Sequence, residues 1–387
     1  MATCSKCIIP DNFPKVEMNN GICSFCKINE QKFVHKLKIS KDKELQSLLN
    51  GSNQNKYDCV VPISGGKDST YILYYLVKNL NLTPLAVFFD NGFATDDAKN
   101  NVEDICKKLN VDLIIRHASV YRRKLIREAW YISFYREKLI SLCGNCENNI
   151  RTVSINEALN HNIRYIIWGS TDYEDDASGL LNISTKKFRD RFSGSNNFIK
   201  SLTTFLKTIA RIFIKEKISF LAKMMAFIHY LKYLHYYVID NIKLKAPEGL
   251  KRYSPFLEVS FRNKKTETLY FYDYVPYDPF NQIKILEREI GWKAPSGREA
   301  KMDCELHYVS NFGDLKQTGI TNSGFKLSVL VRNGMISRDE ALKKEQREVE
   351  FLKNYFQSEK LEIKPVLHVM KDKIFMHNKN LNAKKNN

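Results

Sequence analysis

The string Ser64-Gly65-Gly66-Lys67-Asp68-Ser69 has the composition of a loop that binds phosphate groups. Adjacent glycines let the main chain approach an anion closely, and successive amides can then point at the same oxygen atoms. Ser64 and Ser69 add hydroxyl donors, and Lys67 adds a positive charge. Asp68 is expected either to cap a following helix or to orient a magnesium ion. The spacing differs from that of a Walker-type loop, whose Lys-Ser/Thr pair follows a longer spacer.

Two groups of polar residues follow other apolar runs and could complete a nucleotide site. Asp90-Asn91-Gly92 comes directly after residues 84–89, and a carboxylate at the carboxyl edge of a parallel sheet suits the hydroxyl groups of a ribose. Gly169-Ser170 follows the expected strand 164–168 in the same way. A simple turn is the alternative for the first group. The acidic residues 174–176 are expected to be either magnesium ligands or a solvated turn.

Four cysteines near the amino terminus have the spacing of a zinc site. Cys4 and Cys7 form one Cys-x-x-Cys pair, and Cys23 and Cys26 form another after 15 intervening residues. Two such knuckles are typical of tetrahedral, four-thiolate zinc. The surrounding residues are too poor in apolar side chains to fold by packing alone, so zinc is expected to supply the folding free energy.

A third Cys-x-x-Cys pair lies in the middle of the chain. The pattern places Cys143 and Cys146 between two helices, so that Cys146 would begin the second helix, where the dipole lowers the pKa of a thiol. Together with Cys304, the pair could hold an iron–sulfur cluster or a second zinc ion. A redox couple and two packed thiols are the alternatives. Cys59 and Cys106 lie in apolar segments, which predicts plain burial.

The segments around these residues predict an α/β fold with a doubly wound, mostly parallel sheet. Short apolar runs alternate with stretches of helical periodicity, a pattern that is typical of helices on both faces of such a sheet. The expected strands are 57–63, 84–90, 111–115 and 164–168, and the expected helices are 68–80, 96–109, 121–142 and 147–160. Thr95 or Asp96 is the expected cap of the second helix. The loop 64–69 would then open a helix, whose unpaired amides and dipole favour an anion.

Composition divides the chain into five expected parts. These are a zinc module with a charged helix at about 30–50 (residues 1–50), a nucleotide-binding α/β domain (56–180), a basic aromatic helical insertion (181–252), a segment that packs back on the core (253–377) and a disordered tail (378–387). A polar linker, residues 51–55, separates the first two parts.

The insertion carries most of the net positive charge. The chain has a net charge of +18, and residues 186–252 contain 15 Lys and Arg against 4 Asp and Glu, which gives +11. Phenylalanines recur there at steps of seven or eight residues and so share one helical face: Phe198, Phe205, Phe213, Phe220 and Phe227. An anionic membrane surface, a nucleotide-sugar or tRNA is the expected partner. The alternative is a hairpin whose Phe face packs on the core while its Lys side chains are solvated.

The sequence predicts neither secretion nor a membrane span. No run approaches the ~20 uncharged apolar residues that a spanning helix needs. The amino terminus does not resemble a signal peptide, and Cys-x-x-Cys pairs in a reducing compartment are more often metal ligands than disulfides. We therefore expect a cytoplasmic protein, peripheral at the inner membrane face if the insertion binds lipid.

The loop and its setting resemble those of the PP-loop ATP pyrophosphatases, a family that grips pyrophosphate as a leaving group. Within this family, the chain resembles the N-acetyl sugar amidotransferases of surface-polysaccharide and lipopolysaccharide biosynthesis. Three features carry the resemblance: the amino-terminal Cys pairs followed by residues 57–69, the Cys143/Cys146 pair ahead of a strand ending in Trp168-Gly169, and the stretches 303–308 and 331–341.

This resemblance, over residues 1–180 and 265–345, implies an AMP-forming, ATP-dependent amidotransferase. An acetamido oxygen of an N-acetyl sugar or nucleotide-sugar would attack the α-phosphate of ATP, and ammonia would then displace AMP to leave an acetamidino group. ATP and Mg²⁺ would bind at the loop, where Lys67, Asp68 and Ser69 would act in catalysis. Separate glutaminase and cyclase-like subunits would deliver the ammonia.

Two other functions are compatible with the sequence. A tRNA sulfurtransferase would use the same adenylation chemistry, and the basic charge, the zinc module and a Cys-x-x-Cys with a later Cys resemble the iron–sulfur thiolases. The missing Gly-His-x-x-Asp-Asp string and the Trp168-Gly169 ending argue against it. A sensor that binds ATP without turnover is the other alternative.

His117 and His307 are the candidates for a general base in the reaction.

Overall fold

The structure of the chain is a computed structural model. The described residues are 2–13, 16–32, 40–50, 56–118, 142–171, 266–293 and 303–356, together with positions 220, 221, 223, 224, 227, 228 and 231. Residues 121–141 and 174–176, for which the sequence predicts a helix and an acidic turn, lie outside this set.

Five strands form one parallel sheet, as the alternation of apolar runs predicted. They are β3 (Cys59–Pro62), β4 (Pro84–Asp90), β5 (Leu113–His117), β6 (Tyr165–Trp168) and β7 (Glu267–Tyr270). Their order is β5-β4-β3-β6-β7, and every neighbouring pair is parallel. The sequence did not predict β7, because Glu267-Thr268-Leu269-Tyr270 has neither an apolar run nor a turn signal at its start.

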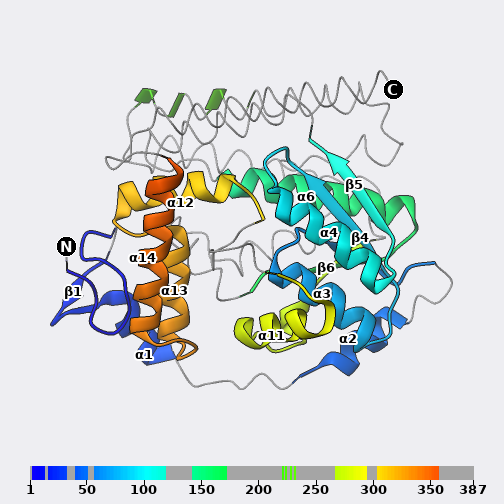
Figure 1. Ribbon diagram of the computed structural model, residues 1–387, viewed down its shortest axis with the longest axis horizontal. Coiled ribbons are helices and arrows are strands. Elements are labelled where there is room, and N and C mark those ends of the chain that lie inside the picture. The colour runs from blue at the N-terminus through cyan, green and yellow to red at the C-terminus, as the bar shows by residue number, and fades with distance from the viewer. Residues whose placement is uncertain are drawn as a thin grey trace.

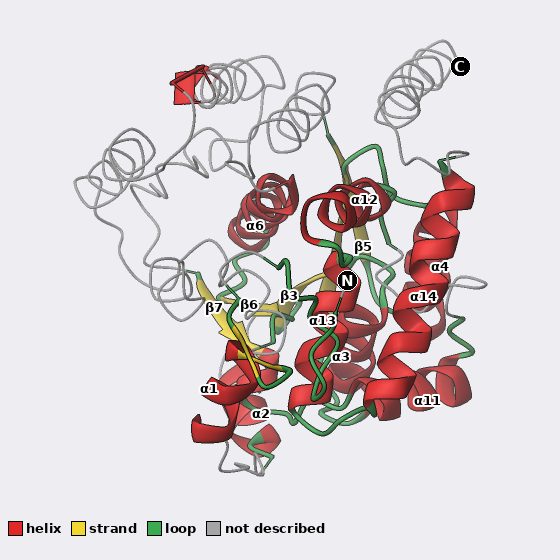
Figure 2. Ribbon diagram, turned by 90° about the vertical axis from the view of Figure 1, so that its left-hand side faces the viewer, coloured by secondary structure: helices red, strands yellow, loops and turns green. Residues whose placement is uncertain are grey.

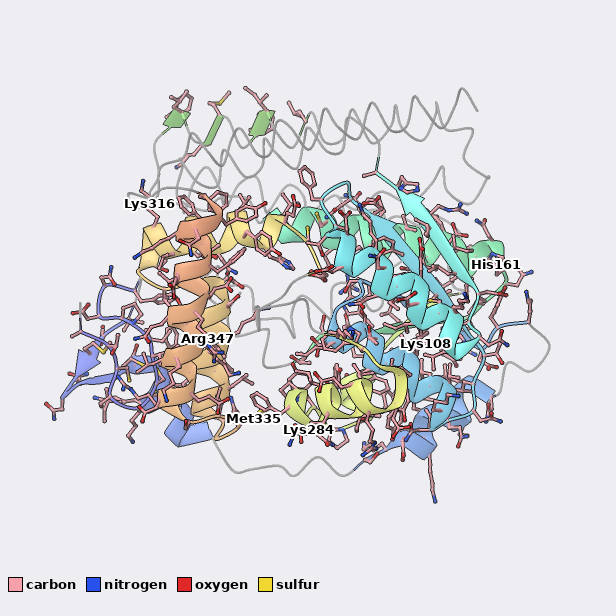
Figure 3. The ribbon with its side chains drawn as sticks, in the orientation of Figure 1. Lys108, His161, Lys284, Lys316, Met335 and Arg347 are labelled. Carbon is pink, nitrogen blue, oxygen red and sulfur yellow. The ribbon has the colours of Figure 1, made fainter. Side chains whose placement is uncertain are left out.

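Helices cover both faces of the sheet because the strand side chains alternate between two apolar layers. Cys59 and Val61 belong to the core shared with α3 (Lys67–Lys78), α4 (Asp96–Leu109) and α11 (Pro279–Ile290). Val60 belongs to the opposite core, with α6 (Leu142–Asn160). Figure 2 shows α6 on one side of the strands and α3 on the other. Lys108, labelled in Figure 3, ties α4 to α11 by donating to the carbonyl of Ile290 at 2.7 Å.

The strand order places a topological switch between β3 and β6. The chain moves outward from β3 through β4 to β5, and then returns to the other side of β3 to form β6 and β7. In open α/β sheets, ligands bind at the carboxyl ends of the strands at such a point. The phosphate-type loop 64–69 follows β3 directly, so the fold places it at this position.

Two predicted helix boundaries were wrong. The charged helix expected at 30–50 is replaced by α1 (Ser24–Lys32) and α2 (Asp42–Asn50), because the second cysteine knuckle itself continues into a helix. The Cys143/Cys146 pair does not separate two helices at its own position. Instead, α6 begins at Leu142 and includes both cysteines in its first turns.

The carboxyl-terminal helices form a second body with the amino-terminal module. These helices are α12 (Leu306–Thr318), α13 (Asn322–Arg332) and α14 (Arg338–Tyr355), and α13 and α14 form an antiparallel hairpin. The module consists of α1 and a small antiparallel sheet of β1 (Met18–Asn19) and β2 (Ile22–Cys23). Figure 1 shows this module beside α13 and α14, on the opposite side of the molecule from β4 and β5. A short 3-10 turn, η3 (Phe271–Asp273), follows β7 and leads toward α11.

Candidate functional site

The loop after β3 has the backbone shape of an anion-binding turn. Gly65 has a φ of +78°, and a Cβ atom there would lie 2.2 Å from the carbonyl oxygen of Ala98, so no larger residue fits. Gly66 is the N-cap of α3, and no side chain caps this helix end. The expected capping by Asp68 is therefore wrong. The first amides of α3 remain open to an anion, which is the helix-terminus arrangement that favours phosphate.

Hydrogen bonds between the two serines close the loop. The amide of Ser64 donates to Oγ of Ser69 at 3.1 Å, and the two hydroxyl oxygens lie 3.2 Å apart. The hydroxyl of Ser69 also donates to the carbonyl of Gly66 at 3.3 Å. Both hydroxyls thus lie at the mouth of the loop, where they can be shared with a bound phosphate.

Side chains from distant segments hold the loop from behind. The indole nitrogen of Trp292 donates to the carbonyl of Gly65 at 3.2 Å, and the amide of Asn101 approaches the same oxygen at 3.5 Å. Trp292 is buried and follows α11, whereas Asn101 lies on α4. The sequence analysis missed both residues, because no local pattern links them to the loop.

Two hydrogen bonds hold the ammonium group of Lys67 beside the loop. Its ammonium group donates to the carboxylate of Asp68 and, at 3.0 Å, to the hydroxyl of Tyr277. Tyr277 lies between η3 and α11, and it too was missed by the sequence analysis. These contacts keep a positive charge beside the loop, where it can neutralise phosphate oxygens.

Asp90 is a buried carboxylate at the carboxyl end of β4. Its oxygens accept from the amide of Gly92 at 2.8 Å and lie 3.1 Å from Nδ1 of His117, at the end of β5. Burial alone would raise the pKa of Asp90, but the contacts with His117, Gly92 and Lys99 outweigh it and lower the pKa below its usual value. Asp90 is therefore ionised and fixed, as a ribose-binding carboxylate needs to be.

Asn91 brings two cysteines together at the same sheet edge. Its side-chain amide donates to Sγ of Cys304 at 3.4 Å and to Sγ of Cys146 at 3.6 Å. Cys304 reaches this place through a bridge with Ala94, in the loop between β4 and α4. Burial and the neighbouring Cys146 raise the pKa of the Cys304 thiol well above its usual value. Cys143 lies in the same turn of α6, but its side chain is outside the described part.

Asp303 brings a second carboxylate to the phosphate loop. A Cβ atom on Gly66 would lie 3.7 Å from its Oδ2 atom, and its Oδ1 atom lies 3.0 Å from Nδ1 of His307. The main chain is fixed, because the carbonyl of Asp303 accepts from the amide of Thr95 at 3.2 Å. The sequence analysis did not include Asp303 among the site residues, although it precedes Cys304.

Gly169 and Ser170 continue this edge at the end of β6. A Cβ atom on Gly169 would lie 2.8 Å from Ile72, so the glycine lets β6 pack closely against α3. The hydroxyl of Ser170 accepts from the indole nitrogen of Trp168 at 2.8 Å. The guanidinium group of Arg151 stacks on Trp168 at 4.1 Å from the ring centroid. Gly169 and Ser170 thus lie at the carboxyl end of β6, and their contact with a nucleotide stays a prediction.

The four amino-terminal cysteines form a group that can bind a metal ion. Their sulfur atoms lie within 4.8 Å of one another, and all four residues are buried. The sulfur atoms of Cys7 and Cys23 are 3.6 Å apart, and those of Cys4 and Cys26 are 3.8 Å apart. A tetrahedron with Zn–S bonds of ~2.3 Å has edges of about 3.8 Å, so the spacing fits tetrahedral thiolate coordination.

The thiols of this group compete for protons. Hydrogen bonds from Cys26 and Cys7 lower the pKa of Cys23 to about 2, whereas the hydrogen bond to Cys23 raises the pKa of Cys7 to about 12. The hydrogen bond between Cys26 and Cys23 likewise raises the pKa of Cys26. One thiolate is thus shared among its neighbours, and a bound cation would allow all four to ionise.

The cysteine group is attached to the carboxyl-terminal hairpin. Nε of Arg338 donates to the carbonyls of Cys4 at 3.0 Å and Cys7 at 2.9 Å, and Arg332 donates to the sulfur of Cys7 at 3.9 Å. Phe13 stacks on Phe325 with 5.3 Å between the ring centroids. The stretch 331–341, which the sequence analysis singled out, therefore supports the metal group rather than the nucleotide loop.

Comparison with known families finds a match for part of the central domain. Residues 58–200 match the family described as the phosphoadenosine phosphosulfate reductase domain. The matched segment contains the loop at residues 64–69, and a parallel sheet with this loop directly after β3 is the PP-loop type of fold.

The individual proteins that resemble this chain match it over part of its length or at low sequence identity. An uncharacterized protein of Methanocaldococcus jannaschii is 32% identical over 116 residues, which are 29% of this chain and 41% of that protein, so the chain spans less than half of its length. The NH3-dependent NAD synthetase of Campylobacter jejuni, solved with a nitrate ion, is similar over 50% of this chain and 93% of its own, with 14% identity and a TM-score of 0.27. The U34-tRNA thiolase NcsA of Methanococcus maripaludis, with its 4Fe–4S cluster, is similar over 89% of both chains, with 13% identity and a TM-score of 0.32.

Proposed function

We propose that this chain is an ATP-dependent, AMP-forming amidotransferase that converts the acetamido group of an N-acetyl sugar into an acetamidino group during surface-polysaccharide biosynthesis. The loop geometry at Gly65 and Gly66 supports the ATP chemistry, because the start of α3 has no side-chain cap and Lys67 and two serine hydroxyls lie in the same loop. The sugar substrate rests on the sequence resemblance of residues 1–180 and 265–345 to the N-acetyl sugar amidotransferases.

The proposed reaction has two balanced steps. The acetamido oxygen attacks the α-phosphate of ATP, the bond to the β-phosphate oxygen breaks, and pyrophosphate leaves. Ammonia then adds to the activated carbon, AMP leaves with the former acetamido oxygen, and one proton is released. The loop amides and Lys67 stabilise the departing pyrophosphate, and Asp90 orients the ribose. Mg²⁺ would neutralise further phosphate charge, with Asp68 and Asp303 as the carboxylates beside the loop.

Zinc is the proposed occupant of the amino-terminal cysteine group, where the sulfur spacing and the complete burial suit a structural ion. The zinc ion would not take part in the reaction, because its four tetrahedral positions would be filled by Cys4, Cys7, Cys23 and Cys26. Its role is to fold the module that supports the α13–α14 hairpin.

A pyrophosphate-release assay with ammonium and a panel of nucleotide-linked N-acetyl sugars tests the proposal. We expect AMP and pyrophosphate in equal amounts, and a product one mass unit lighter, as expected when NH replaces O. Lys67→Met should lower the turnover number by about 100-fold or more, because it removes a charge aimed at the leaving group. Lys78→Met, at the exposed end of the same helix, is the matched control. ATP turnover with none of the sugars would contradict the sugar substrate while leaving the loop assignment standing.

Ammonia delivery by other subunits is part of the proposal. We expect the purified chain to use ammonium but not glutamine, and a co-expressed glutaminase with its channel subunit to restore glutamine use. Glutamine use by the purified chain alone, as efficient as ammonium use, would contradict the need for partners.

A second candidate, a tRNA sulfurtransferase, is favoured by one specific contact set. Cys146 and Cys304 both accept hydrogen bonds from Asn91 at the carboxyl end of the sheet. Cys143 precedes Cys146 by three residues on α6. Together with Cys143, these two thiols could hold an iron–sulfur cluster or a second metal ion. The basic charge of residues 186–252 would then contact tRNA.

Anaerobic purification separates the two candidates. A cluster-bearing thiolase would be brown, would bind tRNA tightly at low salt, and would lose its iron in Cys304→Ser but not in Cys106→Ser, which alters a buried thiol of α4. A colourless chain whose metal content is one zinc ion in the wild type and in both variants would exclude the cluster.

A further inference from the structure

An exposed apolar helix face lies within the basic insertion. Of the seven described positions between 220 and 231, all are helical, and four carry large apolar side chains that are exposed: Phe220 at 72%, Leu221 at 56%, Ile228 at 44% and Leu231 at 46%. In the whole described part of the chain, only Ile28 and Leu48 are also exposed large apolar residues. The exposed apolar surface is therefore concentrated on this helix.

The four side chains lie on one side of the helix. At about 100° per residue, positions 220, 221, 228 and 231 fall within an arc of about 100°, and Met224 falls inside the same arc. Lys223 lies about 60° beyond the edge of the arc, on the flank of the apolar face. Figure 1 shows the described pieces of this helix at the outer margin of the molecule, away from the sheet. Packing of the Phe face on the core, one of the expectations from the sequence, does not hold for Phe220.

We propose that this face inserts into the surface of an anionic lipid bilayer. An interfacial helix combines an apolar face, which enters the boundary between headgroups and acyl chains, with basic residues that contact anionic headgroups. The helix lies within residues 186–252, which carry a net charge of +11. Within the described residues, no helix is long and apolar enough to cross a membrane.

The charge and the side-chain types argue against other occupants. Two copies of a segment with a charge of +11 would repel each other, so the face does not suit self-association. Single-stranded RNA is held largely by bases stacked on aromatic rings, whereas three of the four exposed side chains are aliphatic. Contact with an acyl chain does not require aromatic rings. This inference is independent of the sugar substrate proposed above.

Vesicle co-sedimentation of the full-length protein tests the inference. We expect binding to phosphatidylcholine vesicles that contain phosphatidylglycerol, binding at least about tenfold weaker to pure phosphatidylcholine, and weaker binding at high salt. Replacing Phe220, Leu221, Ile228 and Leu231 together by Ser should reduce binding to anionic vesicles by at least about tenfold. The double variant Ile28→Ser/Leu48→Ser, which alters the other two exposed apolar residues, should bind like the wild type.

A second variant keeps the test decisive if the fourfold variant does not fold. Phe220→Trp preserves an apolar face, and its fluorescence should be quenched by lipids brominated on their acyl chains but not by soluble quenchers once vesicles are present. Three results would overturn the inference: no binding to anionic vesicles, binding that the fourfold variant leaves unchanged, or a wild-type dimer that the fourfold variant converts to monomer. Retention of RNA in place of vesicles would overturn it as well.

Discussion

At the scale of single residues, the charges that face loop 64–69 decide how the loop can bind phosphate groups. Lys67 is held by Asp68 and Tyr277, and Asp303 places a carboxylate over Gly66. A carboxylate beside a phosphate site is repelled by the ligand unless a cation lies between them. We therefore expect Asp303 to act with Asp68 in positioning Mg²⁺.

Asp303→Asn tests this role. We expect the Mg²⁺ concentration for half-maximal pyrophosphate release to rise by at least about tenfold, because losing a group that holds a metal typically costs ~10–100-fold in affinity. Calorimetric binding of ATP with and without Mg²⁺ gives a readout independent of turnover, and Asp104→Asn, on the exposed side of α4, is the control. Tighter binding of Mg²⁺-free ATP with an unchanged Mg²⁺ requirement would show that Asp303 acts only by repulsion.

At the scale of elements, a side chain of α14 caps the start of α13. The carboxylate of Glu345 on α14 accepts from the amide and hydroxyl of Thr321, the N-cap of α13, at 2.8 and 2.6 Å. Burial raises the pKa of Glu345 to about 7, and the hydrogen bonds from Thr321 offset only part of this effect. The hairpin therefore contains a group that titrates near neutral pH.

The free energy of unfolding should depend on this group. Because the pKa of Glu345 is about 7 in the folded chain against 4.5 for an ordinary glutamate, the folded state binds more protons between these values. Stability contributed by Glu345 is thus present below pH 4.5 and is lost as the pH rises toward 7. The loss is at most roughly 3 kcal/mol, from the difference between the two pKa values.

Urea unfolding as a function of pH measures this contribution. Glu345→Gln keeps the acceptor for the amide of Thr321 and cannot ionise, so the fall in stability across this window should become shallower than in the wild type. Glu350→Gln, on the exposed side of α14, should retain the wild-type slope. Identical slopes in all three proteins would contradict the assignment.

At the scale of the whole molecule, the amino-terminal four-cysteine group and the carboxyl-terminal hairpin form one core. Cys4, Cys7, Cys23 and Cys26 share a buried cluster with Phe325, Val329 and Ile336 of the hairpin region. The α12 helix follows Cys304 directly and packs on this hairpin. Metal binding near residue 4 is therefore connected through α12–α14 to the segment that carries Asp303.

Metal removal should loosen both ends of the chain together. After chelation, we expect faster amide hydrogen exchange in residues 2–32 and also in α13 and α14, while β3 and β4 stay protected, because the core of the module depends on the ion. Arg338→Ala should reproduce part of the effect by removing the hydrogen bonds to Cys4 and Cys7. Arg347→Ala, on the exposed face of α14 and labelled in Figure 3, should not. Unchanged exchange in α13 and α14 after chelation would contradict this connection.

The features that could be predicted are those encoded within a few neighbouring residues. The span of α4 and its Thr95 cap agree with the prediction, and β4 has the predicted bounds, because helical periodicity, capping and an apolar run are local. The predicted start of α6 was wrong, since Gly144 and Asn145 are poor helix formers and their local preference predicts a break that α6 does not have.

By itself, the sequence determined the parallel α/β fold, the loop at residues 64–69 and the four-cysteine group, because each depends on residue types at short, fixed spacings. Only the tertiary structure decided that Trp292 supports the loop from behind, that Asp303 lies over Gly66, and that Cys146 and Cys304 meet at Asn91. These contacts join residues up to 227 positions apart. They depend on strand order and on the bridge between Ala94 and Cys304, which no local spacing encodes.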